Sequence, residues 1–262
     1  MQIIALLLFA AFIAWIAFNL TKKKIVETVA FTNGYRAVLT DNVTYYSQLP
    51  DADKVEFEER MQQFLSQVKI TGVGTAVTIE DMVFVGASAI IPIFAFKNWQ
   101  YNNLNEVLLY PESFNQEFNT DNEQAKPVLG MVGNGALQQV MILSQPALRQ
   151  GFTNKTHKEN TGIHEFVHLI DKTDGDVDGV PENLLDKQYL LPWINLMHNS
   201  IKEILAGKSD INPYGATNKA EFFAVVAEYF FERPDLLQAK HPELYLLLEQ
   251  VFRQNPAKVM VN

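Results

Sequence analysis

The stretch His164-Glu165-Phe166-Val167-His168 decides how the rest of the chain is interpreted. On a helix, residues four positions apart project from the same face, so both imidazoles can reach one metal ion. Glu165 points about 100° away from His164, beside such an ion rather than on it. A carboxylate in that position can take a proton from a water held by the metal. Because neutral imidazole suits zinc, the motif predicts a catalytic zinc site with one position left open for water.

The motif also has a plain structural interpretation, in which two surface histidines and a solvated glutamate share an ordinary helix. The neighbouring sequence favours the metal. Ile163, Val167 and Ile170 form an apolar stripe on the far side, which predicts a buried helix. Buried histidines need polar partners, and a bound metal ion would supply one.

The composition allows a large folded domain and excludes several kinds of function. The chain has 262 residues, of which 48% are hydrophobic and 19% are charged, enough for one large domain or two small ones. Its net charge of −9 argues against a nucleic-acid partner, which would need a basic face. Because the chain has no cysteine, it has no disulfide, no thiol nucleophile and no cysteine-based zinc site.

An uncharged apolar run over residues 3–20 predicts one N-terminal transmembrane helix. As a helix it would be roughly 27 Å long, near the ~30 Å of a bilayer core. Lys22, Lys23 and Lys24 follow the run, and no lysine or arginine precedes it. By the positive-inside rule, we expect a single-pass protein of the inner, cytoplasmic membrane, with its catalytic domain facing the cytoplasm. The alternative is an apolar N-terminal helix that packs on its own soluble domain.

The pattern along the chain predicts an α+β fold with a small sheet and a mainly helical C-terminal half. We expect residues 1–24 to form the anchor with its basic flank, residues 25–50 a linker, and residues 51–262 the folded domain. Helical periodicity predicts helices over residues 51–68, 220–232 and 242–253, and one helix or two over residues 183–206.

Apolar runs bounded by turn residues predict the strands. Residues 106–110 and 140–144 each fit a strand, whereas residues 76–96 fit either a strand followed by a helix or two buried elements. Polar residues 115–127 predict a loop. Residues 140–144 have two interpretations: an edge strand that pairs with an extended substrate, or an ordinary core strand.

Two histidines need a third ligand, and Asp174 is one candidate. It lies ten residues after His164, the offset of the third ligand in the extended motif, but Asp171 occupies the glycine position of that motif. Asp171 has a candidate role of its own. It lies three residues after His168 on the ligand face, where its carboxylate could accept an imidazole N–H.

Glu221 and Glu228 are the other two candidates, and their spacing of seven residues places them on one face of an apolar helix. Glu221 also fits a capping box with Asn218 at the start of that helix. Glu228 is an acid within an apolar stretch and needs a buried partner, which ranks it slightly ahead of Glu221.

Several segments together resemble the Mlc titration factor A family of zinc peptidases, and the likeness extends from about residue 50 to residue 255. The segments are H-E-F-V-H-L-I-D (164–171), D-G-x-x-D-G-V-P (174–181), Y-G-A-T (214–217), A-E-F-F-A-V (220–225), E-Y-F-F (228–231) and, more loosely, L-L-Y-P-E-S-F (108–114).

The resemblance implies a zincin-like metallopeptidase domain with a site of the gluzincin kind. His164, His168 and Glu221 match the family's ligands for one zinc ion per chain, and Glu165 matches its catalytic glutamate. We adopt Glu221 as the third ligand on that basis. Glu228 then becomes a carboxylate that supports a ligand from behind.

The resemblance also implies that Tyr214 faces the active site, where its hydroxyl could donate a hydrogen bond to the developing oxyanion. The other interpretation of Tyr214 is a turn tyrosine in Asn-Pro-Tyr-Gly. The expected function is zinc-dependent hydrolysis of a peptide or protein substrate, with Glu165 as the general base. The alternative, implied by the family name, is a binding module that sequesters a transcriptional regulator.

Overall fold

A small sheet forms the base of the computed structural model, which describes residues 31–113, 129–133 and 138–259. In the described residues the sheet has the order β1-β2-β4-β3. The strands are β1 (Lys69–Gly72), β2 (Glu106–Tyr110), β4 (Val140–Ser144) and β3 (Gly130–Val132). β1, β2 and β4 run parallel, whereas β3 runs antiparallel to β4.

The two predicted strands pair with each other in the interior of the sheet. The register runs from Glu106 opposite Val140 to Tyr110 opposite Ser144. The prediction for residues 106–110 and 140–144 is therefore confirmed. β4 lies between β2 and β3, so residues 140–144 form a core strand, and β1 and β3 form the two edges of the sheet in the described residues.

The N-terminal half supplies helices α2 (Asn33–Asn42), α3 (Thr44–Gln48), α4 (Asp51–Gln67) and α5 (Ile79–Ile90). α4 confirms the helix predicted there. α5 is a helix followed by turns, without the strand that we considered for residues 76–96. α2 and α3 fall in the range expected as a linker, and Leu39 and Tyr46 of these helices are buried. The division of the chain into anchor, linker and domain stays a prediction, and residues 115–127 lie outside the described part.

The C-terminal half is mainly helical, as predicted. Its α-helices are α6 (Gln145–Thr153), α7 (Thr161–Asp171), α8 (Lys187–Leu205), α9 (Lys219–Glu232), α10 (Pro234–Lys240), α11 (Pro242–Phe252) and α12 (Pro256–Val259). Two 3-10 turns, η2 (Lys172–Asp174) and η3 (Pro213–Ala216), lie at the end of α7 and before α9. The small sheet and the mainly helical C-terminal half together confirm the α+β class.

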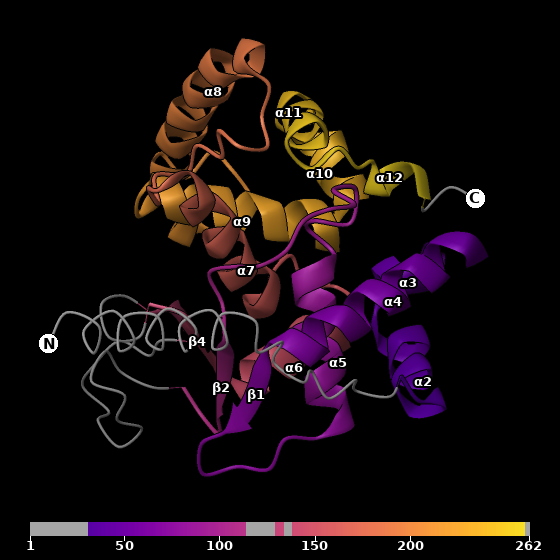
Figure 1. The fold of residues 1–262 in the computed structure, drawn as a ribbon. Coiled ribbons are helices and arrows are strands. Elements are labelled where there is room, and N and C mark those ends of the chain that lie inside the picture. Colours follow the sequence, from indigo (N-terminus) through magenta and orange to yellow (C-terminus); the bar gives the residue numbers. More distant parts are fainter. Residues whose placement is uncertain (1–30, 114–128, 134–137, 260–262) are drawn as a thin grey trace, which may run out of the picture.

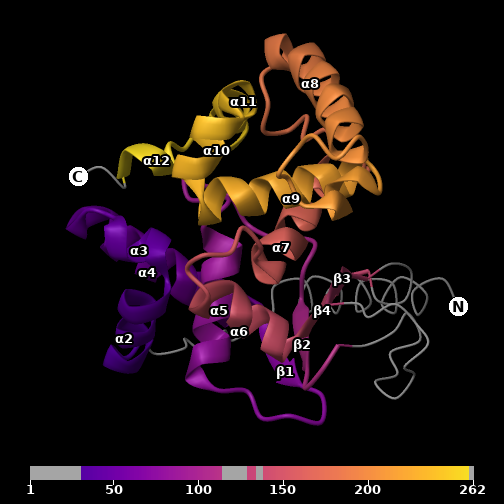
Figure 2. The ribbon, with the colours of Figure 1, turned by 180° about the vertical axis from the view of Figure 1, so that it is seen from behind.

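α7, the helix of the histidine motif, lies between the sheet and α9 (Figures 1 and 2). Phe166 turns inward and packs against the rings of Phe64 and Tyr101, at centroid distances of 5.6 and 5.2 Å. Gly162 lets α7 approach α5, because a Cβ there would lie 2.1 Å from the Ser88 hydroxyl. These contacts fix the rotation of α7, so its two histidines face the opposite side.

The predicted membrane anchor needs a correction. Residues 3–20, on which that prediction rests, lie outside the described residues. Across the residues that are described, no helix combines the length and the apolar character needed to cross a bilayer. The expected single-pass location with a domain facing the cytoplasm is therefore wrong on the present structure.

Asp81 links α5 to α6 through a buried carboxylate. Thr78 and Asp81 form a capping box at the start of α5. The Asp81 carboxylate also accepts from Gln145 Nε2 at 2.8 Å and from Arg149 Nε at 2.8 Å. Burial raises the pKa of Asp81, but hydrogen bonds from Arg149 and Thr78 outweigh burial and bring it below its ordinary value. The group is therefore ionised and fully partnered.

Replacing Asp81 by alanine should lower the free energy of unfolding by about 2–3 kcal/mol, because Arg149 and Gln145 would lose their shared acceptor. The cost is below that of a fully enclosed pair, since the Arg149 side chain is 36% exposed. Urea denaturation measures this change in the free energy of unfolding. Asp51→Ala, at an exposed position of α4, should change the value by less than about 0.5 kcal/mol; equal effects would contradict the prediction.

Candidate metal centre

α7 brings the two histidines of the motif together. The helix begins at Asn160, whose side chain accepts the N–H of Ile163 at 3.1 Å. One turn separates His164 from His168, and their Nε2 atoms lie 3.1 Å apart. His164 is only 8% exposed. Two imidazole nitrogens this close need a shared proton or a shared cation between them.

Glu221 joins this pair from the first turn of α9. Its Oε2 atom lies 2.9 Å from His164 Nε2 and 3.4 Å from His168 Nε2. Asn218 caps the helix and accepts the backbone N–H of Glu221 at 2.9 Å, while the Glu221 carboxylate lies at the histidines. Among the described residues, His164, His168 and Glu221 are the group that could hold a metal ion.

The donor set and its spacing fit a zinc-sized cation. Two ligand atoms bound to a tetrahedral zinc ion lie about 3.3 Å apart, given bond lengths of about 2.0–2.1 Å. The three ligand atoms here are separated by 2.9, 3.1 and 3.4 Å. Two imidazoles and one carboxylate are also ligands that zinc accepts. The residues present are therefore compatible with a metal ion.

Asp174 does not join the group. Its carboxylate instead accepts the backbone N–H of Glu182 at 3.1 Å and that of Asp176 at 3.4 Å. These two hydrogen bonds form a turn that follows the end of α7.

Glu228 lies behind His164, on the opposite side of the ring from Glu221. Its Oε1 atom lies 2.6 Å from His164 Nδ1, and its Oε2 atom accepts the backbone N–H of Asn160 at 2.5 Å. The residue is 6% exposed. A carboxylate on Nδ1 fixes both the tautomer and the orientation of an imidazole ligand. The sequence could not reveal the contribution of Asn160, because a backbone N–H has no residue signature.

The carboxylates favour a positive charge at His164. Burial lowers the pKa of His164, but Glu228 and Glu221 outweigh burial and raise it well above its ordinary value. Burial raises the pKa of Glu221, yet the hydrogen bonds to the two imidazoles bring it well below its ordinary value. The same negative field would stabilise a bound cation.

Glu165 points from α7 toward the edge strand β3. It is 4% exposed, and its Oε2 atom has no hydrogen-bond partner among the described residues. A Cβ at Gly130 would lie 2.5 Å from Glu165 Oε1, so this glycine makes room for the carboxylate. Burial raises the pKa of Glu165. The sequence analysis missed the part played by Gly130, although glycines at 130, 133 and 135 mark the region.

Tyr214 reaches the site from η3. Its ring centroid lies 5.9 Å from that of His164, and the residue is 53% exposed. Burial of its inner part, together with the negative charges of Glu221 and Glu165, raises the pKa of Tyr214 to about 12. The hydroxyl therefore keeps its proton and can act as a hydrogen-bond donor at neutral pH.

A cleft of about 630 Å³ joins these residues, and β3 forms one wall of it. Ser144 N donates to Leu129 O, and Gly133 N donates to Val140 O. Because backbone groups alternate along an antiparallel strand, Gly130 and Val132 direct theirs away from β4, toward the edge that no described strand covers. An extended peptide could pair with that edge.

Asp171 is close to the site but does not form the predicted hydrogen bond. Its Oδ2 atom accepts the N–H of Gly179 at 2.8 Å. Within the described residues, Asp171 Oδ1 and His168 Nδ1 both lack a hydrogen-bond partner. Burial raises the pKa of Asp171 to about 7. Its role toward an imidazole stays a prediction.

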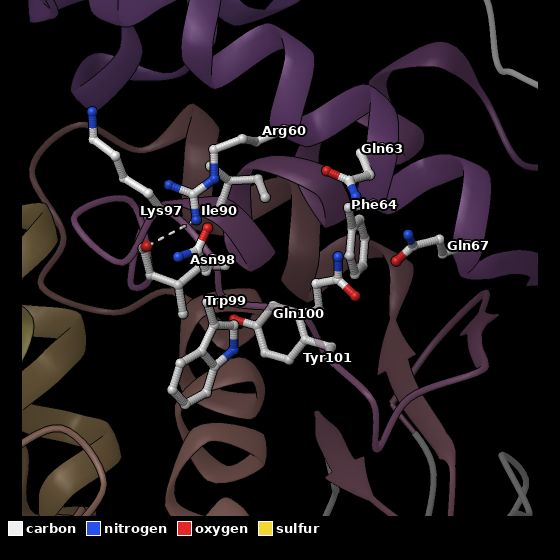
Figure 3. Close-up of a pocket in the computed structure, with 11 residues that line it drawn as sticks. Arg60, Gln63, Phe64, Gln67, Ile90, Lys97, Asn98, Trp99, Gln100 and Tyr101 are labelled. Atoms are coloured by element: carbon white, nitrogen blue, oxygen red, sulfur yellow. Dashed lines mark hydrogen bonds between the residues drawn. The ribbon is translucent and has the colours of Figure 1, made fainter.

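A second hollow, of about 330 Å³, lies beside α4 (Figure 3). Arg60 closes one side by donating to the carbonyl oxygens of Ile93 and Phe96, at 3.0 and 3.1 Å. The lining of this hollow contains no imidazole and no carboxylate, and the hollow shares no residue with the cleft at His164. We therefore place the candidate chemistry in the first cleft.

A histidine-motif helix that faces a glutamate-bearing helix beside a small sheet defines a metallopeptidase-type protein. The family model described as glucose-regulated metallo-peptidase M90 matches residues 17–253, and the chain belongs to this family. Since that match covers most of the chain, the resemblance found in the sequence is confirmed.

Individual relatives agree with the family. An uncharacterized protein of Synechocystis sp. is 28% identical over 234 residues, covering 85% of this chain and 84% of that protein. Mlc titration factor A of Pectobacterium atrosepticum is 28% identical over 63% of this chain and 65% of its own length. Mlc titration factor A of Escherichia fergusonii is 31% identical over 59% of this chain and 61% of its own length. The chain thus spans less than two thirds of these two named relatives.

Glu221→Ala should abolish tight binding of a divalent ion, because it removes one of three clustered ligands, whereas Asp174→Ala should leave binding unchanged. Titration of the metal-free protein with Zn²⁺, followed by metal analysis after dialysis, measures both. We expect close to one ion per chain in the unsubstituted protein and in Asp174→Ala. Loss of the ion from Asp174→Ala with retention in Glu221→Ala would reverse the assignment.

Proposed function

We propose that this chain is a zinc-dependent peptidase in which His164, His168 and Glu221 hold the ion and Glu165 is the general base. The observation that carries the proposal is the position of Glu165. It is buried and lines the cleft beside the two histidines and Glu221, and its Oε2 atom lacks a hydrogen-bond partner among the described residues. A structural glutamate would be expected to have one.

Each residue then has a defined task. A bound zinc ion would lower the pKa of its water and polarise the scissile carbonyl. Glu165 accepts the proton of the attacking water and passes it to the leaving amine. Burial raises the pKa of Glu165, which favours its uptake of that proton.

Glu228, Tyr214 and β3 complete the proposed mechanism. Glu228 holds the His164 ring through Nδ1, so that Nε2 stays directed at His168 and Glu221, where it would hold the ion. The Tyr214 hydroxyl donates a hydrogen bond to the oxyanion that develops on the substrate. The backbone groups of Gly130 and Val132 that point away from β4 hold an extended peptide beside Glu165.

Glu165→Gln should reduce kcat by about 10²–10⁴-fold while the protein still binds one zinc ion, because glutamine fills the same space but cannot accept a proton. Hydrolysis of a peptide library and metal analysis on the same preparation measure the two quantities. Glu203→Gln, at an exposed position of α8, is the matched control and should retain full activity. A Glu165→Gln protein that cleaves at the unsubstituted rate would exclude Glu165 as the base.

The names of the relatives favour a second function of a different class. Several similar proteins are named Mlc titration factor A. By analogy, this chain would bind a regulatory protein and sequester it, with peptidase activity secondary. Such binding needs a surface and does not need the metal.

Capture of purified Mlc on the immobilised chain tests this second function. If binding is independent of the metal centre, the unsubstituted chain and a His164→Ala, His168→Ala double variant should retain equal amounts of Mlc. An unrelated immobilised protein gives the background. Retention at background level by both forms would remove the sequestration hypothesis for this partner, and loss in the double variant alone would make binding part of the peptidase site.

A further inference from the structure

The carboxylate of Asp210 ties the segment that carries Tyr214 to several other parts of the protein. Asp210 lies four residues before Tyr214, between α8 and α9 (Figure 1). Four side-chain donors converge on its carboxylate. They are Lys158 Nζ at 2.6 Å, His241 Nε2 at 2.7 Å, Lys240 Nζ at 2.9 Å and Tyr229 Oη at 3.0 Å.

The charges make Asp210 a persistent anchor. Burial raises the pKa of Asp210, but hydrogen bonds from Lys158, Lys240 and His241 outweigh burial and bring it well below its ordinary value. The carboxylate is therefore ionised at neutral pH. Charge-assisted hydrogen bonds of this kind are roughly twice as strong as neutral ones, and together these donors exceed what one surface ion pair contributes.

The donors come from three separate parts of the fold. Lys158 lies just before α7, Tyr229 is on α9, and Lys240 and His241 lie at the junction of α10 with α11. Asp210 thus fixes the segment against the helices that carry the metal ligands, rather than against its own neighbours in sequence.

A second tie lies two residues closer to Tyr214. Asn212 Nδ2 donates to Glu159 Oε1 at 2.6 Å, and Asn212 Oδ1 accepts the N–H of Tyr214 at 2.9 Å. Lys158 Nζ also donates to the backbone oxygen of Asp210 at 2.8 Å. Lys158 and Glu159, immediately before the metal helix, therefore hold both Asp210 and Asn212.

Tyr214 depends on this support because it has little packing of its own. The residue is 53% exposed, and its ring centroid lies 5.9 Å from that of His164. A misplacement of about 1 Å in a catalytic donor is enough to lose much of its contribution. The position of the Tyr214 hydroxyl over the cleft therefore depends on the backbone of residues 210–214 as well as on the neighbouring Glu221 carboxylate.

We propose that Asp210 is a positioning residue that holds Tyr214 over the metal-side cleft. The proposal rests on the proposed function of this site for its kinetic consequence, but its structural part is independent of the metal. Asp210 touches neither the ligand atoms nor the cleft lining. We therefore expect its effect on turnover to pass through Tyr214, and the double-mutant cycle below separates this route from one through α7 or α9.

A double-mutant cycle tests this dependence. Asp210→Asn should reduce kcat for peptide hydrolysis on the order of tenfold in the unsubstituted chain, with KM and zinc content little changed. In a Tyr214→Phe background, the same substitution should change kcat by less than about twofold, because the hydroxyl is already absent. An equal loss in both backgrounds would show that Asp210 acts only on general stability and would overturn the proposal.

Amide hydrogen exchange gives a readout that does not need activity. Gly215 N–H donates to Asn212 O and Thr217 N–H to Tyr214 O, each at 3.0 Å. Asp210→Asn should speed exchange at these two amides and leave the amides of α7 unchanged. Unchanged exchange at Gly215 and Thr217 would overturn the proposal even if peptidase activity is never found.

Two further variants guard against a trivial outcome. Lys158→Met removes one of the four donors while keeping the chain length, so it should produce the same pattern with smaller amplitude. Asp235→Asn removes an ion-paired aspartate on α10 that lies 3.4 Å from Arg233 and does not contact the tyrosine segment. It should leave both kcat and exchange unaltered; a matching effect from Asp235→Asn would assign the result to net charge and overturn the proposal.

Discussion

The site depends on the enforced proximity of two imidazole nitrogens and one carboxylate oxygen. The Nε2 atoms of His164 and His168 are 3.1 Å apart, and Glu221 Oε2 lies within 3.4 Å of both. One proton can be shared by only two of these atoms at a time, so a partly buried triad held only by protons leaves lone pairs unpaired. A divalent ion engages all three at once. The packing of α7 on α9 therefore holds together three acceptor atoms, and a bound cation would satisfy their lone pairs.

α9 contacts His164 from both sides with two acids that have opposite surroundings. Glu221 faces the cleft at Nε2, whereas Glu228 is buried at Nδ1. Burial alone had ranked Glu228 ahead of Glu221 as a ligand. Burial does not show which ring nitrogen an acid reaches: Glu228 lies at Nδ1 of His164, whereas Glu221 Oε2 lies within 3.4 Å of the Nε2 atoms of both histidines. The most enclosed acid is better placed to orient the imidazole.

The elements with strong local patterns could be predicted from the sequence. α4, α9 and α11 have clear apolar periodicity, and β2 and β4 are apolar runs bounded by turns. β3 has three residues, too few for a periodic signal, and its place at the sheet edge depends on pairing with β4. The histidine pair was visible because its spacing is local, whereas the contribution of Glu221 came from family likeness. Asp210 had no signal, because its four donors are distant in sequence.

Residues 158–160, directly before the metal helix, explain how parts from three elements can keep one geometry. Each of these residues contacts a different part of the site, and each contact crosses a long distance in sequence. The pairs are Lys158 with Asp210, Glu159 with Asn212, and the backbone N–H of Asn160 with Glu228. Because Asn160 also caps α7, any displacement of the helix start would move the tyrosine segment and the acid behind His164 together. Contacts of this kind preserve relative positions even when the whole unit shifts, which is the property that a preorganised catalytic site requires.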